Sequence, residues 1–88
     1  MQRVHVLIEG SVTGVGFRFF VQRNASLLNI KGWIKNISEN KIEAVFEGQE
    51  QDIKKLLEIC KEGPSLSYIK TIKVKEEEFQ NLTKFEVK

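Results

Sequence analysis

Apolar and polar residues along this chain follow two periods, one typical of strands and the other of helices. Apolar residues alternate with polar ones in four segments, which predict strands at 3–9, 30–38, 42–47 and 68–75. Apolar residues recur three or four positions apart in two segments, which predict helices at 17–29 and 49–62. Phe85 and Val87 indicate a possible short fifth strand near the end of the chain.

Turn residues separate these segments and help to define the fold class. Ser38 to Lys41 predicts a hairpin turn in which Asn40 can adopt left-handed φ, and Gly63-Pro64 predicts the end of the second helix. The expected order is therefore βαββαβ. Two helices with one apolar stripe each need a single sheet face to cover. We expect an α+β, ferredoxin-like two-layer sandwich, with an antiparallel sheet and both helices on one face.

Length, charge and cysteine content narrow the class of protein. The 88 residues are expected to form a single domain, 1–88, and a monomer is the simplest assembly. A net charge of +2 is too small to indicate a nucleic-acid partner. No segment approaches membrane-spanning length and the N-terminus lacks the apolar region of a secretory signal, so a cytoplasmic location is expected. The one cysteine, Cys60, falls on the apolar stripe of the second helix and is expected to be a buried apolar residue.

A glycine-punctuated loop joins the first strand to the first helix. Three glycines lie within seven residues there, so several backbone N–H groups can turn toward one point ahead of a helix N-terminus. Arg18 adds a planar, permanently charged group that can bind two phosphate oxygens. The candidate phosphate-binding residues are Thr13, Gly14, Val15, Gly16, Phe17 and Arg18. The spacing matches neither a P-loop nor a dinucleotide fingerprint, and a loop that only turns the chain is the alternative.

Asn36 lies near the end of the second predicted strand. In the expected topology the first two strands run parallel on either side of the third, so their carboxyl ends lie at the same edge of the sheet. Asn36 falls on the helix-covered side, as Ile34 does. We therefore expect Asn36 to lie close to Arg18 and the loop; a cap at the strand end is the alternative.

Two motifs of this sequence resemble the acylphosphatase signature in order and spacing. They are Gly-Ser-Val-Thr-Gly-Val-Gly-Phe-Arg at 10–18 and Gly-Trp-Ile-Lys-Asn at 32–36. The similarity continues through Gly48 and Gly63-Pro64 and so covers nearly the whole chain. The chain departs from the family pattern in three places. Thr13 replaces the usual glutamine, Asn29 replaces a common glycine, and Glu39-Asn40 replaces the usual Asp-Gly turn.

The resemblance implies hydrolysis of the carboxyl–phosphate bond of an acyl phosphate, with a carboxylate and inorganic phosphate as products. Phosphoryl transfer needs positioning and charge stabilisation. The amides of residues 13–18 and Arg18 would bind the phosphoryl group, and Asn36 would hold the attacking water; Arg18 and Asn36 are thus the candidate catalytic residues. No cofactor or metal is expected, and the partner is a small acyl phosphate, without nucleic acid or membrane.

Other functions of this fold class lack their own signals here. An RNA-recognition domain needs exposed aromatic residues on its central strands, but Leu7 and Val45 occupy outward positions. A metal chaperone needs a Cys-x-x-Cys motif in its first loop. The remaining alternative is a non-catalytic anion-binding module, or a relative of the acylphosphatase-like domain of carbamoyl-transfer hydrogenase-maturation proteins.

Overall fold

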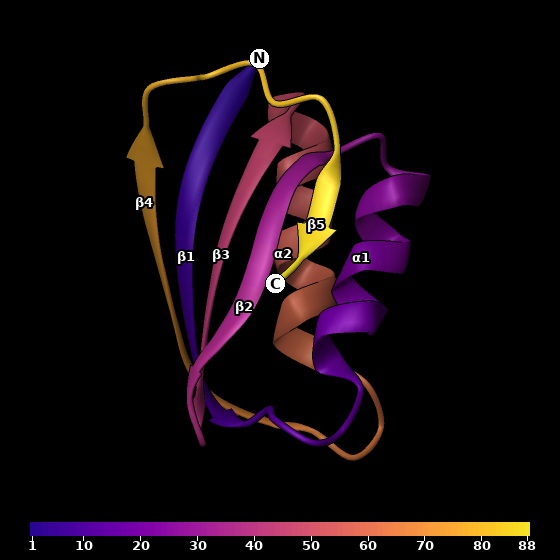
Figure 1. The fold of residues 1–88 in the computed structure, drawn as a ribbon, viewed down its shortest axis with the longest axis vertical. Helices are drawn as coiled ribbons and strands as arrows, with labels where there is room; N and C mark the ends of the chain where they lie inside the picture. Colours follow the sequence, from indigo (N-terminus) through magenta and orange to yellow (C-terminus); the bar gives the residue numbers. More distant parts are fainter.

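The computed structural model describes all residues, 1–88, and contains every expected element (Figure 1). The elements in chain order are β1 (Gln2–Ser11), α1 (Phe17–Leu27), β2 (Lys31–Ser38), β3 (Lys41–Gly48), α2 (Glu50–Glu62), β4 (Tyr68–Glu77) and β5 (Phe85–Val87). The ends of the elements differ from the expected ones by no more than two residues. The 3.6-residue and two-residue periods of the sequence therefore define the local structure well.

The five strands form one sheet in the order β4-β1-β3-β2-β5, and both helices lie on the same side of it (Figure 1). The pairs β1–β3, β1–β4 and β2–β3 are antiparallel, which confirms the ferredoxin-like arrangement. The fifth strand runs parallel to β2, with Phe85 opposite Gly32 and Val87 opposite Ile34. The sheet is therefore mixed, because β5 adds one parallel pairing to an otherwise antiparallel set.

A continuous apolar core fills the space between the sheet and the helices. Its members are inward-facing strand residues, such as Val6, Ile34 and Phe46, and the apolar stripes of the two helices. Cys60 belongs to this core and has no exposed surface, and burial raises the pKa of its thiol to about 12. The prediction of a buried apolar cysteine is thus confirmed. Neither helix combines the length and the apolar character needed to cross a membrane.

Positive backbone φ values occur after both helices. Asn29 follows α1 with φ 56°, where the family pattern often has glycine, and Gly63 follows α2 with φ 65°. Asparagine tolerates this conformation better than other side chains. Asn40, expected to be able to adopt it, has negative φ. Its side chain instead accepts a hydrogen bond from Ser38 Oγ at 3.0 Å within the turn.

The connection from β4 to β5 crosses one end of the sheet, near the N-terminus (Figure 1). The buried carboxylate of Glu47 holds it, accepting the backbone N–H groups of Gln80 at 2.8 Å and Leu82 at 2.7 Å. Arg3 donates to the same carboxylate from Nη1 at 3.0 Å, and to Glu77 from Nε at 3.0 Å. The opposite end of the sheet carries the glycine-punctuated loop.

Candidate functional site

The loop between β1 and α1 is fixed at both ends by buried side chains. Val12 and Phe17 are each only 1% exposed, and the partly buried Val15 also packs against the core. Between these anchors the chain turns through Gly14 and Gly16, with φ values of 75° and 73°. An added Cβ at either glycine would meet no atom within 4 Å, so glycine is needed there for its backbone conformation.

The backbone donors of this loop have no partners within the chain. None of the N–H groups of residues 13–18 donates a hydrogen bond to a backbone or side-chain acceptor; the first N–H beyond them that does so is that of Phe20, which donates to the Gly16 carbonyl at 3.0 Å. Gly16 is the N-cap of α1, no side chain caps the helix, and its first turn holds no acidic residue. Unpaired donors at the positive end of a helix dipole form a suitable environment for an anion.

Arg18 lies in the first turn of α1 and is held by the end of β5. Its Nη1 donates to the backbone carbonyl oxygen of Lys88 at 2.7 Å, and the N–H of Lys88 donates to the carbonyl of Ile34 at 2.8 Å. A guanidinium has five N–H donors, so one bond orients the group and leaves others for a ligand. The role of Lys88 has no signal in the sequence, because a backbone oxygen makes the contact.

Asn36 lies on β2 with its side chain on the helix-covered face. It is directly opposite Ile42 in the register, and it lies two residues beyond the buried Ile34. Two residues of strand span roughly 7 Å. Lys88 is hydrogen-bonded through its N–H to Ile34 and through its carbonyl oxygen to Arg18. The position of Asn36 and the guanidinium of Arg18 therefore lie at the same edge of the sheet. The Asn36 side chain is exposed and has no hydrogen-bond partner in the chain.

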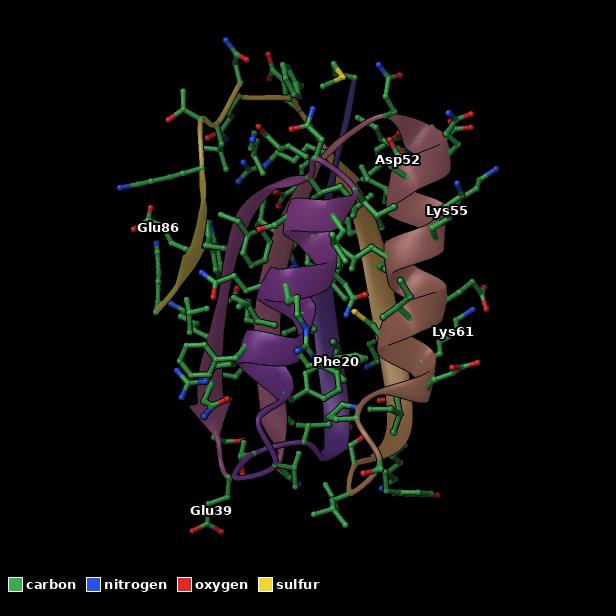
Figure 2. The ribbon with its side chains drawn as sticks, turned by 90° about the vertical axis from the view of Figure 1, so that its right-hand side faces the viewer. Phe20, Glu39, Asp52, Lys55, Lys61 and Glu86 are labelled. Carbon is green, nitrogen blue, oxygen red and sulfur yellow. The ribbon has the colours of Figure 1, made fainter.

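The loop is tied to the hairpin that follows Asn36. The Thr13 hydroxyl donates to the backbone carbonyl of Glu39, and the N–H of Gly10 donates to the carbonyl of Asn40 at 2.9 Å. Figure 2 shows Glu39 at the end of the molecule where the loop enters α1. Thr13 therefore has a structural contact of its own, in a place where the family usually has glutamine.

The edge of the sheet that carries the loop, Arg18 and Asn36 has no histidine or cysteine side chain that could act as a base or a nucleophile. His5, the only histidine, lies on the outward face of the sheet with its Nε2 2.6 Å from Glu43 Oε2, and Cys60 is in the core. The edge thus offers backbone N–H groups, one guanidinium and one carboxamide. This set can bind a tetrahedral oxyanion and orient a water molecule, without a covalent intermediate on the protein.

Comparisons with known proteins agree on one family. The family model described as Acylphosphatase matches residues 4–87. A curated acylphosphatase from Methanocella arvoryzae is 46% identical over 88 residues, which is 100% of this chain and 100% of the relative. The crystal structure of acylphosphatase from Bacillus subtilis superposes with a TM-score of 0.95 at 32% identity, over 99% of this chain and 98% of that one.

The same fold also occurs as part of a larger protein. Full-length HypF, whose crystal structure was determined in a phosphate- and nucleotide-bound form, matches with a TM-score of 0.91 at 39% identity. The match covers 98% of this chain but 11% of HypF. The full-length match to the Methanocella arvoryzae relative makes a small acylphosphatase the better description of the similarity.

Proposed function

This chain belongs to the acylphosphatase family and is an acyl phosphate hydrolase, and we propose that the loop at 13–18, Arg18 and Asn36 carry out its reaction. The observation that supports this proposal most strongly is the continuous run of unpaired N–H groups at residues 13–18, since an anion that met them would satisfy donors that have no other partner.

The phosphoryl group binds to the loop amides and to the guanidinium of Arg18. In the transition state its charge lies on the three equatorial oxygens, which is where fixed donors stabilise it most. The Lys88 carbonyl holds one N–H of the guanidinium at 2.7 Å and so limits its rotation. The remaining N–H groups bind two phosphoryl oxygens as a fork, which a lysine ammonium cannot imitate.

The carboxamide of Asn36 holds the attacking water in line with the scissile bond. Its oxygen accepts a hydrogen bond from the water, and its NH₂ group donates one to the water oxygen. A bond forms between the water oxygen and phosphorus while the bond from phosphorus to the carboxyl oxygen breaks, and the departing carboxylate keeps the electron pair. The water proton passes to a phosphoryl oxygen, so no side-chain base takes part. The leaving carboxylate is stable as an anion, so no side-chain acid takes part either.

We also propose that residues 1–88 act as a single-domain monomer in the cytoplasm, on a small acyl phosphate and without a nucleic-acid or membrane partner. Every group assigned to the reaction comes from one copy of the chain. The free thiol of Cys60 is compatible with a reducing compartment.

The test is hydrolysis of acetyl phosphate by the purified protein in the presence of EDTA. We expect stoichiometric release of inorganic phosphate, with turnover unchanged by the chelator. A matched control is Lys55→Gln, which removes a charge from α2 at the end of the molecule away from the loop (Figure 2) and should retain full activity. Phosphate binding without turnover of any simple acyl phosphate would contradict the proposal and favour an anion-binding module.

A further inference from the structure

A hollow on the surface adjoins the loop on the side away from β5. Its volume is about 440 Å³. Six residues line it: Val15, Gly16, Phe19, Phe20, Arg23 and Pro64. Two of them, Val15 and Gly16, belong to the phosphate-binding loop itself. The hollow is thus continuous with the site described above, yet none of the groups assigned to the phosphoryl group or the water explains its other side chains.

The composition of the hollow is unusual for a solvent-exposed helix face. Phe19 is 62% exposed, although burial of an aromatic ring is normally favourable. Arg23 lies one helical turn beyond Phe19, is exposed, and forms no ion pair or hydrogen bond within the chain. Phe20 supplies a second ring on the α2 side of α1 (Figure 2). An apolar floor with an unpaired cation at its far end is complementary to a ligand that is flat and carries a negative charge.

The position of the hollow matches the direction in which the leaving group departs. In an in-line displacement the leaving group lies opposite the attacking water. Asn36, which holds the water, belongs to β2 on the β5 side of α1, whereas Pro64 belongs to the connection that follows α2. Figure 2 shows α1 between β5 and α2. The hollow and Asn36 therefore lie on opposite sides of the helix N-terminus.

We infer that this hollow is the subsite for the acyl portion of the substrate, and that it favours acyl phosphates with a flat apolar acyl group and a second negative charge beyond it. The inference rests on the proposed function. Arg23 starts about 10 Å from Gly16 along the α1 axis, and helical side chains lean toward the N-terminus. The guanidinium can therefore reach an anionic group on the far side of an aromatic ring whose carboxyl–phosphate end lies at the loop.

The test compares kcat/KM for acetyl phosphate, benzoyl phosphate and 4-carboxybenzoyl phosphate. The unmodified chain should prefer the carboxylated aromatic substrate to benzoyl phosphate, and benzoyl phosphate to acetyl phosphate. Phe19→Ser should lower the ratio of benzoyl to acetyl phosphate activity about fivefold, because the ring contact is lost. Arg23→Gln should lower the ratio of 4-carboxybenzoyl to benzoyl phosphate activity about fivefold at low salt, and the effect should shrink at high salt.

Leu27→Ser is the matched control. Leu27 is 80% exposed on the last turn of the same helix, so its loss should leave both activity ratios unchanged. Variants of Phe19 and Arg23 that leave the ratios unchanged, or that alter the hydrolysis of all three substrates equally, would overturn the subsite. Hydrolysis of acetyl phosphate by the unmodified chain would still support the proposed function. Failure of the unmodified chain to hydrolyse any of the three substrates would instead overturn the proposed function, and the subsite with it.

Discussion

The two ends of the sheet differ in whether their polar groups have hydrogen-bond partners within the chain. At the end near the N-terminus, the carboxylate of Glu47 is 1% exposed and accepts three hydrogen bonds, from Arg3, Gln80 and Leu82. At the opposite end, the N–H groups of residues 13–18 have no acceptor. The first arrangement compensates a buried charge, and the second leaves donors free for a ligand. The difference separates a structural cluster from a binding site more clearly than residue type does.

The two ends are connected through β5. The connection held by Glu47 ends at Lys84, directly before β5, and the carbonyl of Lys84 accepts a hydrogen bond from the N–H of Gly32 at 3.0 Å. Directly after β5, the carbonyl oxygen of Lys88 accepts a hydrogen bond from Arg18. The end of the sheet that holds Glu47, here called the closed end, therefore stabilises β5. The residue that follows β5 orients Arg18 at the opposite end, here called the open end. Variants at each end should separate activity from stability, and the largest expected effect is at the open end.

Arg18→Lys should reduce kcat/KM for acetyl phosphate about 10³-fold, which corresponds to about 4 kcal/mol. An ammonium keeps the charge but loses the planar fork, and it cannot donate to the Lys88 carbonyl and to two phosphoryl oxygens in the same geometry. Steady-state kinetics and the inhibition constant of inorganic phosphate measure the effect, and thermal unfolding should be nearly unchanged. Kinetics close to those of the unmodified chain would remove Arg18 from the mechanism.

Glu47→Gln should lower the free energy of unfolding by about 3 kcal/mol. The substitution places an amide NH₂ among N–H donors and leaves Arg3 with one carboxylate, that of Glu77; removing one partner from a buried pair has costs of this order. Chemical denaturation measures the loss. Turnover of acetyl phosphate under conditions where the variant is fully folded should fall much less than in Arg18→Lys.

The same variant should also be less sensitive to acid. Burial alone would raise the pKa of Glu47, but the N–H donors of Leu82 and Gln80 and the Arg3 guanidinium outweigh it and hold this pKa below the ordinary value of a glutamate carboxyl. The stability that Glu47 contributes is therefore present above the carboxyl's ordinary pKa and is lost as the pH falls through the lowered value. Equal acid sensitivity in the unmodified chain and in Glu47→Gln would contradict this assignment.

The sequence predicted the fold closely because apolar residues recur at a regular spacing in each helix and strand, and turn residues mark where the elements end. The apolar stripes of both helices and the turns at 38–41 and Gly63-Pro64 were sufficient for the order and the layers. The parallel pairing of β5 was beyond prediction, since Phe85 and Val87 indicate an apolar face but no strand partner. The conformation of Asn40 depends on its contact with Ser38, which the pattern does not encode.

The candidate site was predictable where it depends on side chains at fixed spacing. The glycines of the loop, Arg18 and Asn36 lie in two motifs whose strands end at one edge of the sheet. Contacts made by backbone atoms had no such signal. The carbonyl of Lys88 that holds Arg18 and the carbonyl of Glu39 that holds Thr13 could come from any residue type.

Asn36→Ala should lower kcat about 10²-fold, or about 2.7 kcal/mol, with little change in the inhibition constant of inorganic phosphate. The carboxamide has no partner within the chain, so its removal breaks no internal bond and affects the positioning of water. Pre-steady-state and steady-state kinetics, together with the inhibition constant of inorganic phosphate, separate the effect on turnover from the effect on phosphate binding. An equal loss of turnover and of phosphate binding would mean that Asn36 shapes the anion site instead.

Glu43→Gln should have the smallest effect, a loss of less than about 1 kcal/mol in the free energy of unfolding. Glu43 lies on β3 as Glu47 does, and its pKa is also lowered, because the hydrogen bond with His5 outweighs burial. Its side chain is 25% exposed, however, and its partners His5 and Lys35 can be replaced by water. Chemical denaturation of Glu43→Gln and Glu47→Gln at neutral pH compares their free energies of unfolding directly. An equal loss of stability in Glu43→Gln and Glu47→Gln would show that a carboxylate on this face of the sheet stabilises the fold whether or not it is buried. The three hydrogen bonds that Glu47 accepts at the closed end would then contribute nothing further.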